Sequence, residues 1–322
     1  MKAIVYNKYG SPDVLQLKEV EKPFLEDNHV LVKIHAASLN FGNLVLLKGE
    51  PFLARFAFGL FKPKYPIPGG DMAGRVEAVG KNVQQFNPGD EVFGDLSASG
   101  WGGFAEYVSV PENALALKPA NLSFEEAAAV PMAGVTALQS LRDKGKIQPG
   151  QKVLINGASG GVGTFAAQIA KSFGVEVTGV CSTRNVDVLQ SFGVDRVIDY
   201  TKEDFTKNTE KYDLILGVNG HHSIPAYKRV LKQNGIFVHV GGSGAQMFQA
   251  MVLGPWVTMT GSRKMGTFLQ RANQKDLVYL KDLVESGKVK PIIDKCYKLN
   301  EVPEAFRYFE EGRAQGKVVI TM

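Results

Sequence analysis

Cysteine is scarce in this chain, and histidine nearly so: the 322 residues hold two cysteines and five histidines. Cys181 and Cys296 cannot build a disulfide framework or a cysteine-rich structural zinc site. No histidine stands at metal-ligand spacing from a cysteine or a carboxylate. The adjacent His221 and His222 would diverge on an ordinary backbone, which favours a turn or a polar pocket wall over a shared ion. We therefore expect no catalytic metal.

The chain also lacks an uninterrupted hydrophobic run of membrane-spanning length. Residues 153–170 and 233–262 contain no Asp, Glu, Lys or Arg, but glycines interrupt both stretches and Pro255 interrupts the second. Buried core explains them better than a membrane span. The first ten residues, MKAIVYNKYG, alternate like a strand and have no apolar signal core. We expect a soluble, cytoplasmic protein without an integral membrane span, and an organelle is not excluded.

Runs of one charge are absent as well. The net charge of +5 comes from 37 basic and 32 acidic residues spread along the sequence. Without a basic run we expect no nucleic-acid partner, and the small excess suits an anionic cofactor. Glycine is abundant instead, at 35 of 322 residues or about 11%, against about 7% in average proteins. That excess is typical of the tight turns of α/β nucleotide-binding enzymes.

The sequence pattern changes near residue 122. Before it, residues 30–35, 74–80 and 104–110 alternate between turn signals, which predicts a β-rich, barrel-like unit. Ser123 then precedes Glu126 at capping-box spacing. Beyond it we expect strands at 152–156, 175–181, 196–200, 212–218, 235–242 and 256–262, helices at 161–173, 185–193 and 224–235, and a tail with helices at 277–286 and 303–311 and a strand at 317–322. The alternation predicts a parallel sheet with helices on both faces.

The strongest motif is a glycine turn between the strand at 152–156 and the helix at 161–173. Ala158, Gly160 and Gly163 occupy the three small positions of the dinucleotide fingerprint. A tight turn, close approach of a diphosphate and close helix packing require small residues there. We predict that the turn, with Ser159, Gly161 and Val162, binds the cofactor diphosphate at the start of the helix.

The second strand of this α/β region ends in Ser182, Thr183 and Arg184, about 20 residues beyond Gly163. NAD enzymes place an acid there for the ribose hydroxyls. Two hydroxyls and a guanidinium suit a 2′-phosphate instead, so the sequence favours NADP(H). The plainer alternative is a solvated loop arginine.

The chain resembles the zinc-free quinone oxidoreductase branch of the medium-chain dehydrogenase/reductase superfamily. The resemblance rests on segments in the right order along almost the whole chain, among them VLVKIHAASLNFGN, IPGGDMAGRVEAVG, NGASGGVGTFAAQIAK and QGKVVI. Where zinc-dependent relatives carry a cysteine, Ser38 to Asn43 contain none, and Asp71-Met72 replace His-Glu. The resemblance implies an α/β fold in which a GroES-like β-rich domain (residues 1–121 and 266–322) surrounds a nested Rossmann domain with a doubly wound parallel sheet (residues 122–265).

The resemblance also implies function and site residues. It implies NADPH-dependent reduction of quinones or α,β-unsaturated carbonyls by hydride transfer, in a homodimer or tetramer. We expect a homodimer in which residues 256–262 extend the sheet across a two-fold axis. The alternative is an NADPH-binding regulatory or scaffold protein with little turnover. Asn40 would border the nicotinamide, and Asn40 and Tyr65 are the candidate catalytic residues. The further cofactor contacts would come from Thr136, Tyr200, Val218, Gly241, Gly316 and Lys317.

Residues 51–66, PFLARFAFGLFKPKYP, fit the family pattern poorly because many relatives have a shorter connection here. Their phenylalanines are compatible with either a core helix or a substrate lid. The sequence does not identify the acceptor substrate or the proton donor.

The absence of a ligand set generates the first prediction. NADPH-dependent reductase activity should survive exhaustive chelation of the purified protein. Metal analysis before and after chelation is the measurement. Stoichiometric zinc whose removal abolishes turnover would contradict the prediction.

Overall fold

The computed structural model describes residues 1–220, 222–241, 258 and 262–322, and the chain in it divides into two compact units. Unit 1 consists of Met1–Val135, Arg271–Gly287 and Pro291–Met322, and unit 2 of Thr136–Gln270 and Lys288–Lys290. Both boundaries lie later in the chain than the predicted 121/122 and 265/266. The reason is packing within unit 1, where helix α3 (Phe124–Ala128) contacts strands β3 and β4 and helix α9 (Gln274–Glu285) contacts β7.

Unit 1 is rich in β-structure. Its larger sheet has the order β14-β15-β3-β4-β5-β7, with β6 also paired to β3, and β1 and β2 form a separate pair. The strands are β1 (Lys2–Val5), β2 (Gln16–Glu19), β3 (His29–Ser38), β4 (Asp71–Val79), β5 (Glu91–Asp95), β6 (Tyr107–Pro111), β7 (Leu115–Leu117), β14 (Ile293–Lys298) and β15 (Lys317–Thr321). The other helices are α1 (Phe41–Lys48), α2 (Arg55–Phe58) and α10 (Val302–Glu310), and α4 (Pro131–Gln139) crosses the boundary between the units.

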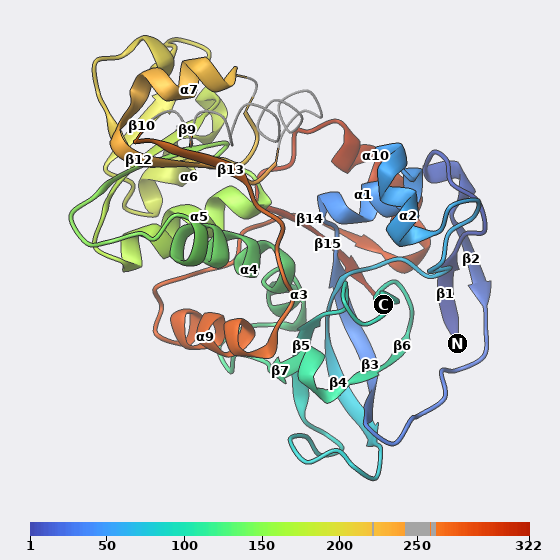
Figure 1. The fold of residues 1–322 in the computed structure, drawn as a ribbon. Coiled ribbons are helices and arrows are strands. Elements are labelled where there is room, and N and C mark those ends of the chain that lie inside the picture. The colour runs from blue at the N-terminus through green and yellow to red at the C-terminus, as the bar shows by residue number, and fades with distance from the viewer. Residues whose placement is uncertain (221, 242–257, 259–261) are drawn as a thin grey trace. The chain divides into compact units, whose positions relative to one another are not determined.

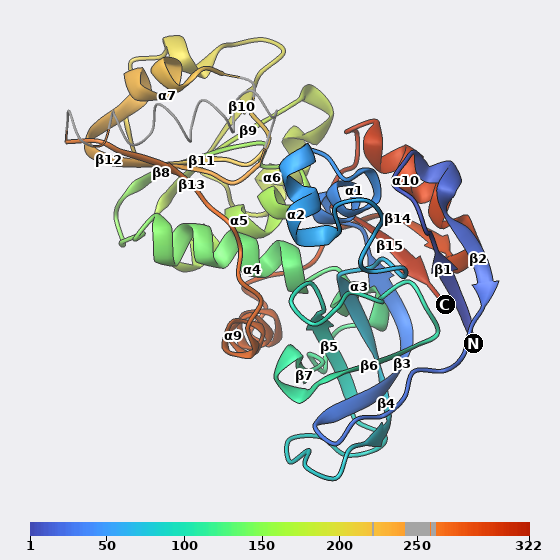
Figure 2. The ribbon, with the colours of Figure 1, turned by 45° about the vertical axis from the view of Figure 1, so that its right-hand side comes forward.

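Apolar side chains of this β-structure pack into two core clusters. Val30, Val32 and Ile34 of β3 pack in one core cluster with Val92 of β5. Residues such as Phe104 and Phe306 form a second cluster, which places α10 beside β14 and β15 (Figure 2). The predicted capping box at the start of α3 is confirmed, because Ser123 Oγ accepts from the Glu126 amide and Glu126 accepts from the Ser123 amide.

Unit 2 contains a parallel sheet of the doubly wound type. In the part of unit 2 that the structure describes, the strand order is β10-β9-β8-β11-β12-β13, and every pairing is parallel. Helices α5 and α7 lie on opposite faces of the sheet (Figures 1 and 2). The strands are β8 (Lys152–Asn156), β9 (Glu176–Cys181), β10 (Arg196–Asp199), β11 (Tyr212–Gly217), β12 (Leu231–His239) and β13 (Lys264–Thr267); the helices are α5 (Gly161–Ser172), α6 (Val186–Ser191) and α7 (Ile224–Val230). The predicted Rossmann architecture is confirmed.

Two predicted elements of unit 2 do not match described elements of the same length. The helix predicted to reach residue 235 ends at Val230, because Leu231 already pairs with Tyr212 as the first residue of β12. Asn234, at a φ of 63°, then interrupts the register before Ile236 pairs with Leu214. The strand predicted at 256–262 lies almost wholly outside the described residues. Within the described part of the chain, no helix is long and apolar enough to cross a membrane.

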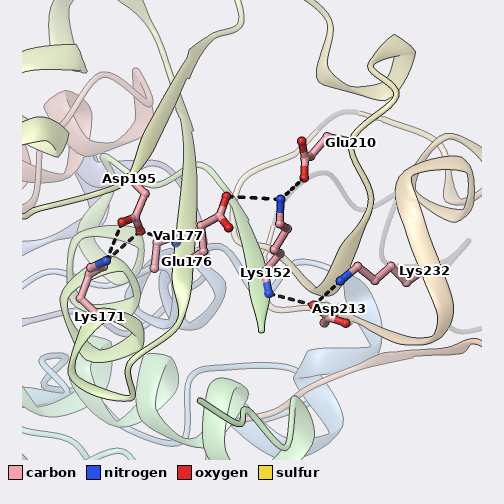
Figure 3. A network of polar contacts seen from close by, with 8 residues as sticks. All are labelled: Lys152, Lys171, Glu176, Val177, Asp195, Glu210, Asp213 and Lys232. Atoms are coloured by element: carbon pink, nitrogen blue, oxygen red, sulfur yellow. Dashed lines mark hydrogen bonds and ion pairs between the residues drawn. The ribbon is translucent and has the colours of Figure 1, made fainter. Parts of the chain in front are cut away.

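Charged side chains join the amino ends of the parallel strands in unit 2 (Figure 3). Asp213 accepts a hydrogen bond from the Lys152 backbone amide at 2.8 Å and from Lys232 Nζ at 2.8 Å. Lys152 Nζ in turn contacts Glu210 and, at 3.5 Å, Glu176. Asp213 therefore ties the first residue of β8 to β12 across the start of β11.

This arrangement predicts a graded loss of stability at Asp213. Asp213→Ala removes both contacts of a half-buried carboxylate and should lower the free energy of unfolding by about 1–2 kcal/mol. Asp213→Asn keeps an acceptor for the Lys152 amide and should cost less than about 1 kcal/mol. Asp282→Ala, at an exposed position of α9, is the matched control and should change stability by less than about 0.5 kcal/mol. Urea unfolding of the full chain measures all three, and equal effects of Asp213→Ala and the control would refute the role.

Candidate cofactor and active site

The predicted glycine turn lies between β8 and α5 in unit 2. Gly157 has a φ of 92°, and a Cβ there would lie 2.8 Å from the Asn219 amide nitrogen. A Cβ at Gly163 would lie 2.1 Å from the Gly157 carbonyl oxygen. The fold itself therefore requires glycine at both positions, since the helix crosses the turn at backbone contact distance.

Gly160 differs, because nothing in the fold explains its missing side chain. Its φ of −81° and ψ of 176° suit any residue, and a Cβ would have its nearest neighbour 3.7 Å away. Gly160 is the N-cap of the twelve-residue helix α5, and no side chain caps that end. The first backbone amides of a helix have no intrahelical acceptor and attract anions. Uncapped helix amides beside a residue without a side chain fit the diphosphate of a dinucleotide.

Other predicted cofactor residues lie along the same carboxyl edge of the unit 2 sheet. The Val218 amide donates to Asn156 O at 2.9 Å, directly before the glycine turn. The Gly241 amide donates to Gly217 O at 3.1 Å, and a Cβ at Gly241 would lie 2.7 Å from Val218 O. Between β8 and β11 the strand order reverses direction, which is where doubly wound folds bind dinucleotides. The structure therefore brings Val218, Gly241 and the turn together.

The end of β9 is tied to the glycine turn by a residue that the sequence analysis missed. Asn185 is buried, and its Nδ2 donates to Ser159 Oγ at 2.9 Å and to Ser182 Oγ at 3.2 Å. The Tyr200 amide donates to Cys181 O at 3.0 Å, so Tyr200 stands beside Ser182 with its side chain exposed. The predicted 2′-phosphate residues thus share one edge.

Thr183 has a different partner from the one expected. Its hydroxyl donates to Asp199 Oδ2 at 2.6 Å, and this bond, ahead of those from Thr201, lowers the pKa of Asp199 to about 2. Lys202 Nζ lies 3.5 Å from the same oxygen. The Thr183 proton is therefore committed within the protein, which leaves Ser182 and Arg184 as the candidate donors to a phosphate.

Asp199 is not recognisable as a site residue from the sequence, because it does not lie at the end of β9, where NAD enzymes carry their acid. It belongs to the next strand along the chain, β10, and pairs with Cys181 at the end of β9. Knowing that β10 follows β9 at the edge of the sheet would have placed it there, since neighbouring parallel strands end together.

A buried polar cluster lies in unit 1, where β3, β4 and β15 meet. Ser38 ends β3 opposite Asp71, the first residue of β4, and Lys317 begins β15. Asn40 is the N-cap of α1, two residues beyond β3. The exposed fraction is 0% for Ser38 and Asp71, 2% for Lys317 and 8% for Asn40. We call these four residues the Asn40 cluster.

The Asp71 carboxylate is the centre of the Asn40 cluster. Its Oδ2 accepts from Ser38 Oγ at 2.8 Å and from Asn40 Nδ2 at 2.7 Å, and Lys317 Nζ lies 3.4 Å away. Its Oδ1 accepts from the backbone amide of Met132 at 2.9 Å. The buried charge is thus fully matched by donors from the elements around it.

Lys317 completes the Asn40 cluster. Its ammonium donates to Leu39 O at 3.0 Å and to Asn40 Oδ1, besides facing Asp71. Burial lowers the pKa of Lys317, and the nearby carboxylates of Asp71 and Asp95 act in the opposite direction.

Of the residues predicted in unit 1, the structure brings Asn40 and Lys317 into hydrogen-bond contact. Gly316 precedes Lys317 at a φ of 93°, where a Cβ would lie 2.4 Å from Ile292 O. Ser38 and Asp71 were not predicted as site residues, although both lie in the two segments that depart from the zinc-dependent pattern. Among the residues that the structure describes, no three His, Cys, Asp or Glu side chains gather so as to hold a metal ion.

The surroundings of Tyr65 and Thr136 do not test the catalytic and cofactor-binding roles predicted for them. Tyr65 is half-buried against the core cluster of Trp101 and Phe104, and Lys64 Nζ lies 5.3 Å from its ring centroid. Thr136 is half-buried within α4. The roles assigned to both remain predictions.

The aromatic segment at 51–66 does not form the core helix that was one alternative. Phe52, Phe56 and Phe61 are 60%, 71% and 90% exposed, and α2 is four residues long. Phe58 is the exception, since its ring packs edge-on at 6.2 Å from Trp101. The substrate lid remains a prediction.

Comparison with known proteins places these two units in one class. The family model described as an alcohol dehydrogenase GroES-like domain matches residues 26–120, and one described as a zinc-binding dehydrogenase matches residues 192–320. The chain is 39% identical to the 2-methylene-furan-3-one reductase of Solanum lycopersicum, over 99% of this chain and 79% of that protein. It is 35% identical to the chloroplastic NADPH-dependent alkenal/one oxidoreductase of Arabidopsis thaliana, with the same coverage of 99% and 79%.

The solved quinone oxidoreductase of Coxiella burnetii superimposes with a TM-score of 0.89 at 32% identity, covering 100% of this chain and 99% of that one. A GroES-like unit that surrounds a Rossmann unit defines the medium-chain dehydrogenase/reductase class. The chain belongs to the quinone oxidoreductase-like branch of that superfamily.

The contrast between Gly160 and Gly163 generates a paired prediction. Gly163→Ala forces a side chain against backbone and should lower the free energy of unfolding by about 2–3 kcal/mol. Gly160→Ala should cost at most about 1 kcal/mol of stability, as expected for alanine at an N-cap. Its methyl group should nevertheless weaken NADPH binding on the order of tenfold, since the diphosphate then loses close approach to the helix amides.

Calorimetric titration with NADPH and urea unfolding separate the two effects. Gly266→Ala is the matched control, because a Cβ there meets nothing within 4 Å, and it should change neither quantity. Unchanged NADPH affinity in Gly160→Ala would show that the diphosphate does not bind at this helix end.

Proposed function

We propose that this protein reduces quinones or α,β-unsaturated carbonyl compounds with NADPH. The observation that carries the proposal is the uncapped amino end of α5 at Gly160, with Ser182 and Arg184 on the same sheet edge. The chain is 39% identical to a 2-methylene-furan-3-one reductase and 35% identical to an NADPH-dependent alkenal/one oxidoreductase. Together with this sheet edge, these identities support an oxidoreductase of the same kind.

The chain's residues would bind and orient, while the cofactor supplies the hydride. The α5 amides would hold the diphosphate, and Ser182 with Arg184 would hold the 2′-phosphate. Asn40, the most exposed member of its cluster, would face the nicotinamide end. Such positioning is the main contribution that a protein makes to hydride transfer.

NADPH oxidation followed at 340 nm with a panel of quinones, alkenals and cyclic enones tests the proposal. Turnover with one class and not with saturated aldehydes or ketones is the expected result. Tight NADPH binding without turnover on any acceptor would instead support a regulatory or scaffold protein. Retention of activity after chelation would add that the reaction needs no metal.

We also propose a homodimer in the cytoplasm. The support for the dimer is the family resemblance and the uncharged, apolar composition of residues 256–262. Light scattering at micromolar concentration tests the dimer, and a monomer would overturn it. Fractionation of source cells tests the location against an organelle, since several relatives carry chloroplast or mitochondrial names.

The proposed cofactor choice makes a prediction at Arg184. Arg184→Ala should lower NADPH affinity on the order of ten- to a hundredfold, because a charge-assisted phosphate contact contributes about 1.5–3 kcal/mol. NADH affinity should hardly change, since its ribose carries no phosphate. Dissociation constants for both cofactors and the melting temperature are the measurements. Equal losses for NADPH and NADH would leave the 2′-phosphate assignment without support.

A further inference from the structure

We infer that Lys317 is a positioning residue that, together with Asp71, holds the side-chain amide of Asn40 in one of its two orientations. The inference rests on the proposed function, because it concerns how Asn40 meets the bound cofactor or acceptor. It assigns Lys317 an action through Asn40 instead of the direct cofactor contact that the family resemblance implies.

The burial of Lys317 supports a role inside the Asn40 cluster. Lysine is almost never buried unless it is paired, and this one is 2% exposed. An ammonium has three protons, and the structure gives it three acceptors: Leu39 O, Asn40 Oδ1 and Asp71 Oδ2. No donor of Lys317 remains for a ligand. The side chain therefore acts inside the Asn40 cluster.

The chemistry of the groups at the two ends of the Asn40 amide fixes the orientation of that amide. Lysine can only donate and a carboxylate can only accept, so the amide oxygen must face Lys317 and the amide nitrogen must face Asp71. Rotating the amide by half a turn would set its NH₂ group against the ammonium and its oxygen against the carboxylate. Two buried repulsive contacts would replace two charge-assisted hydrogen bonds.

This orientation determines which N–H groups of Asn40 remain available to a ligand. The Asn40 backbone amide is already fixed, because it donates to Asn43 Oδ1 at 2.8 Å. Of the side-chain amide, one Nδ2 proton goes to Asp71, and the second proton is not used within the Asn40 cluster. Asn40 is also the cluster member with the largest exposed fraction. We infer that the arrangement leaves one Nδ2–H of Asn40 available to a ligand, polarised by a cation on one side of the amide and an anion on the other.

The available Nδ2–H of Asn40 could donate to a carbonyl oxygen, either that of the cofactor carboxamide or that of the acceptor. A flipped amide would present its own oxygen and would repel either group. The ion pair thus selects a donor over an acceptor at this position without touching the ligand. Loss of a well-directed donor at a reacting carbonyl costs roughly a hundred- to a thousandfold in turnover, and a donor that is only less well directed should cost less.

The test combines Lys317→Met, which keeps the length but removes the donors, with Asn40→Ala and the double variant. We expect Lys317→Met to lower kcat on the order of tenfold while NADPH affinity stays within about twofold. On the Asn40→Ala background, Lys317→Met should add almost nothing, because both changes remove the same donor. Lys33→Met is the matched control: it makes the same substitution at an exposed position of β3 outside the Asn40 cluster and should keep kcat within about twofold.

A second readout needs neither cofactor nor turnover. In the protein alone, exchange of the Asn40 side-chain NH₂ protons with water, followed by nuclear magnetic resonance, should speed up at least about tenfold in Lys317→Met and remain unchanged in Lys33→Met. Should Lys317→Met fail to fold because Asp71 is left unpaired, Lys317→Met/Asp71→Asn removes both charges and takes its place in every measurement.

The outcomes separate the inference from the proposed function. Wild-type protein that turns over no acceptor overturns the function, whatever the exchange data show. An active wild type whose Lys317→Met variant keeps its kcat, or loses as much on the Asn40→Ala background as alone, overturns the inference. Unchanged exchange of the Asn40 amide in the lysine variant overturns it as well.

Discussion

One buried carboxylate organises the end of unit 1 that carries Asn40. Asp71 has no exposed surface, and an unmatched charge there would destabilise the fold by several kcal/mol. Its four donors come from β3, from the N-cap of α1, from α4 and from β15. Satisfying this single group therefore fixes where four separate parts of the chain meet, and the orientation of the Asn40 amide follows from the same contacts.

Unit 2 shows the opposite use of polar groups at its two sheet edges. At the amino ends of the strands, Asp213 and Lys152 match backbone and side-chain charge within the protein. At the carboxyl ends, glycine replaces any capping side chain, so the amides at the start of α5 lack an internal partner of that kind. The edge with matched charges holds the sheet together, and the edge without a capping side chain is the anion site that we propose. Asn185 joins the two parts of that site through Ser159 and Ser182.

The sequence predicted those features that depend on neighbouring residues. Strand and helix periods located β8, α5 and β9, and the spacing of Ser123 and Glu126 located a cap. The cluster around Asp71 could not be predicted in this way, since Ser38 and Asp71 are 33 residues apart and Lys317 is 246 residues beyond Asp71. Only the pairing of β3 with both β4 and β15 brings them together. The exposed phenylalanines of 51–66 illustrate a further limit, because periodicity does not show which side of a short helix finds a partner.

The side chains of the Asn40 cluster differ from a metal ion in how they could act on a ligand. A metal ion offers an open coordination position that polarises an alkoxide directly. The buried ammonium of Lys317 has all three protons bound within the protein and offers no such position. In the role that we infer for Lys317, its charge reaches a ligand through the Asn40 amide, as a single directed hydrogen bond. A donor of that strength suits reactions in which negative charge spreads over a conjugated enolate or hydroquinone, more than reactions that concentrate it on one alkoxide oxygen.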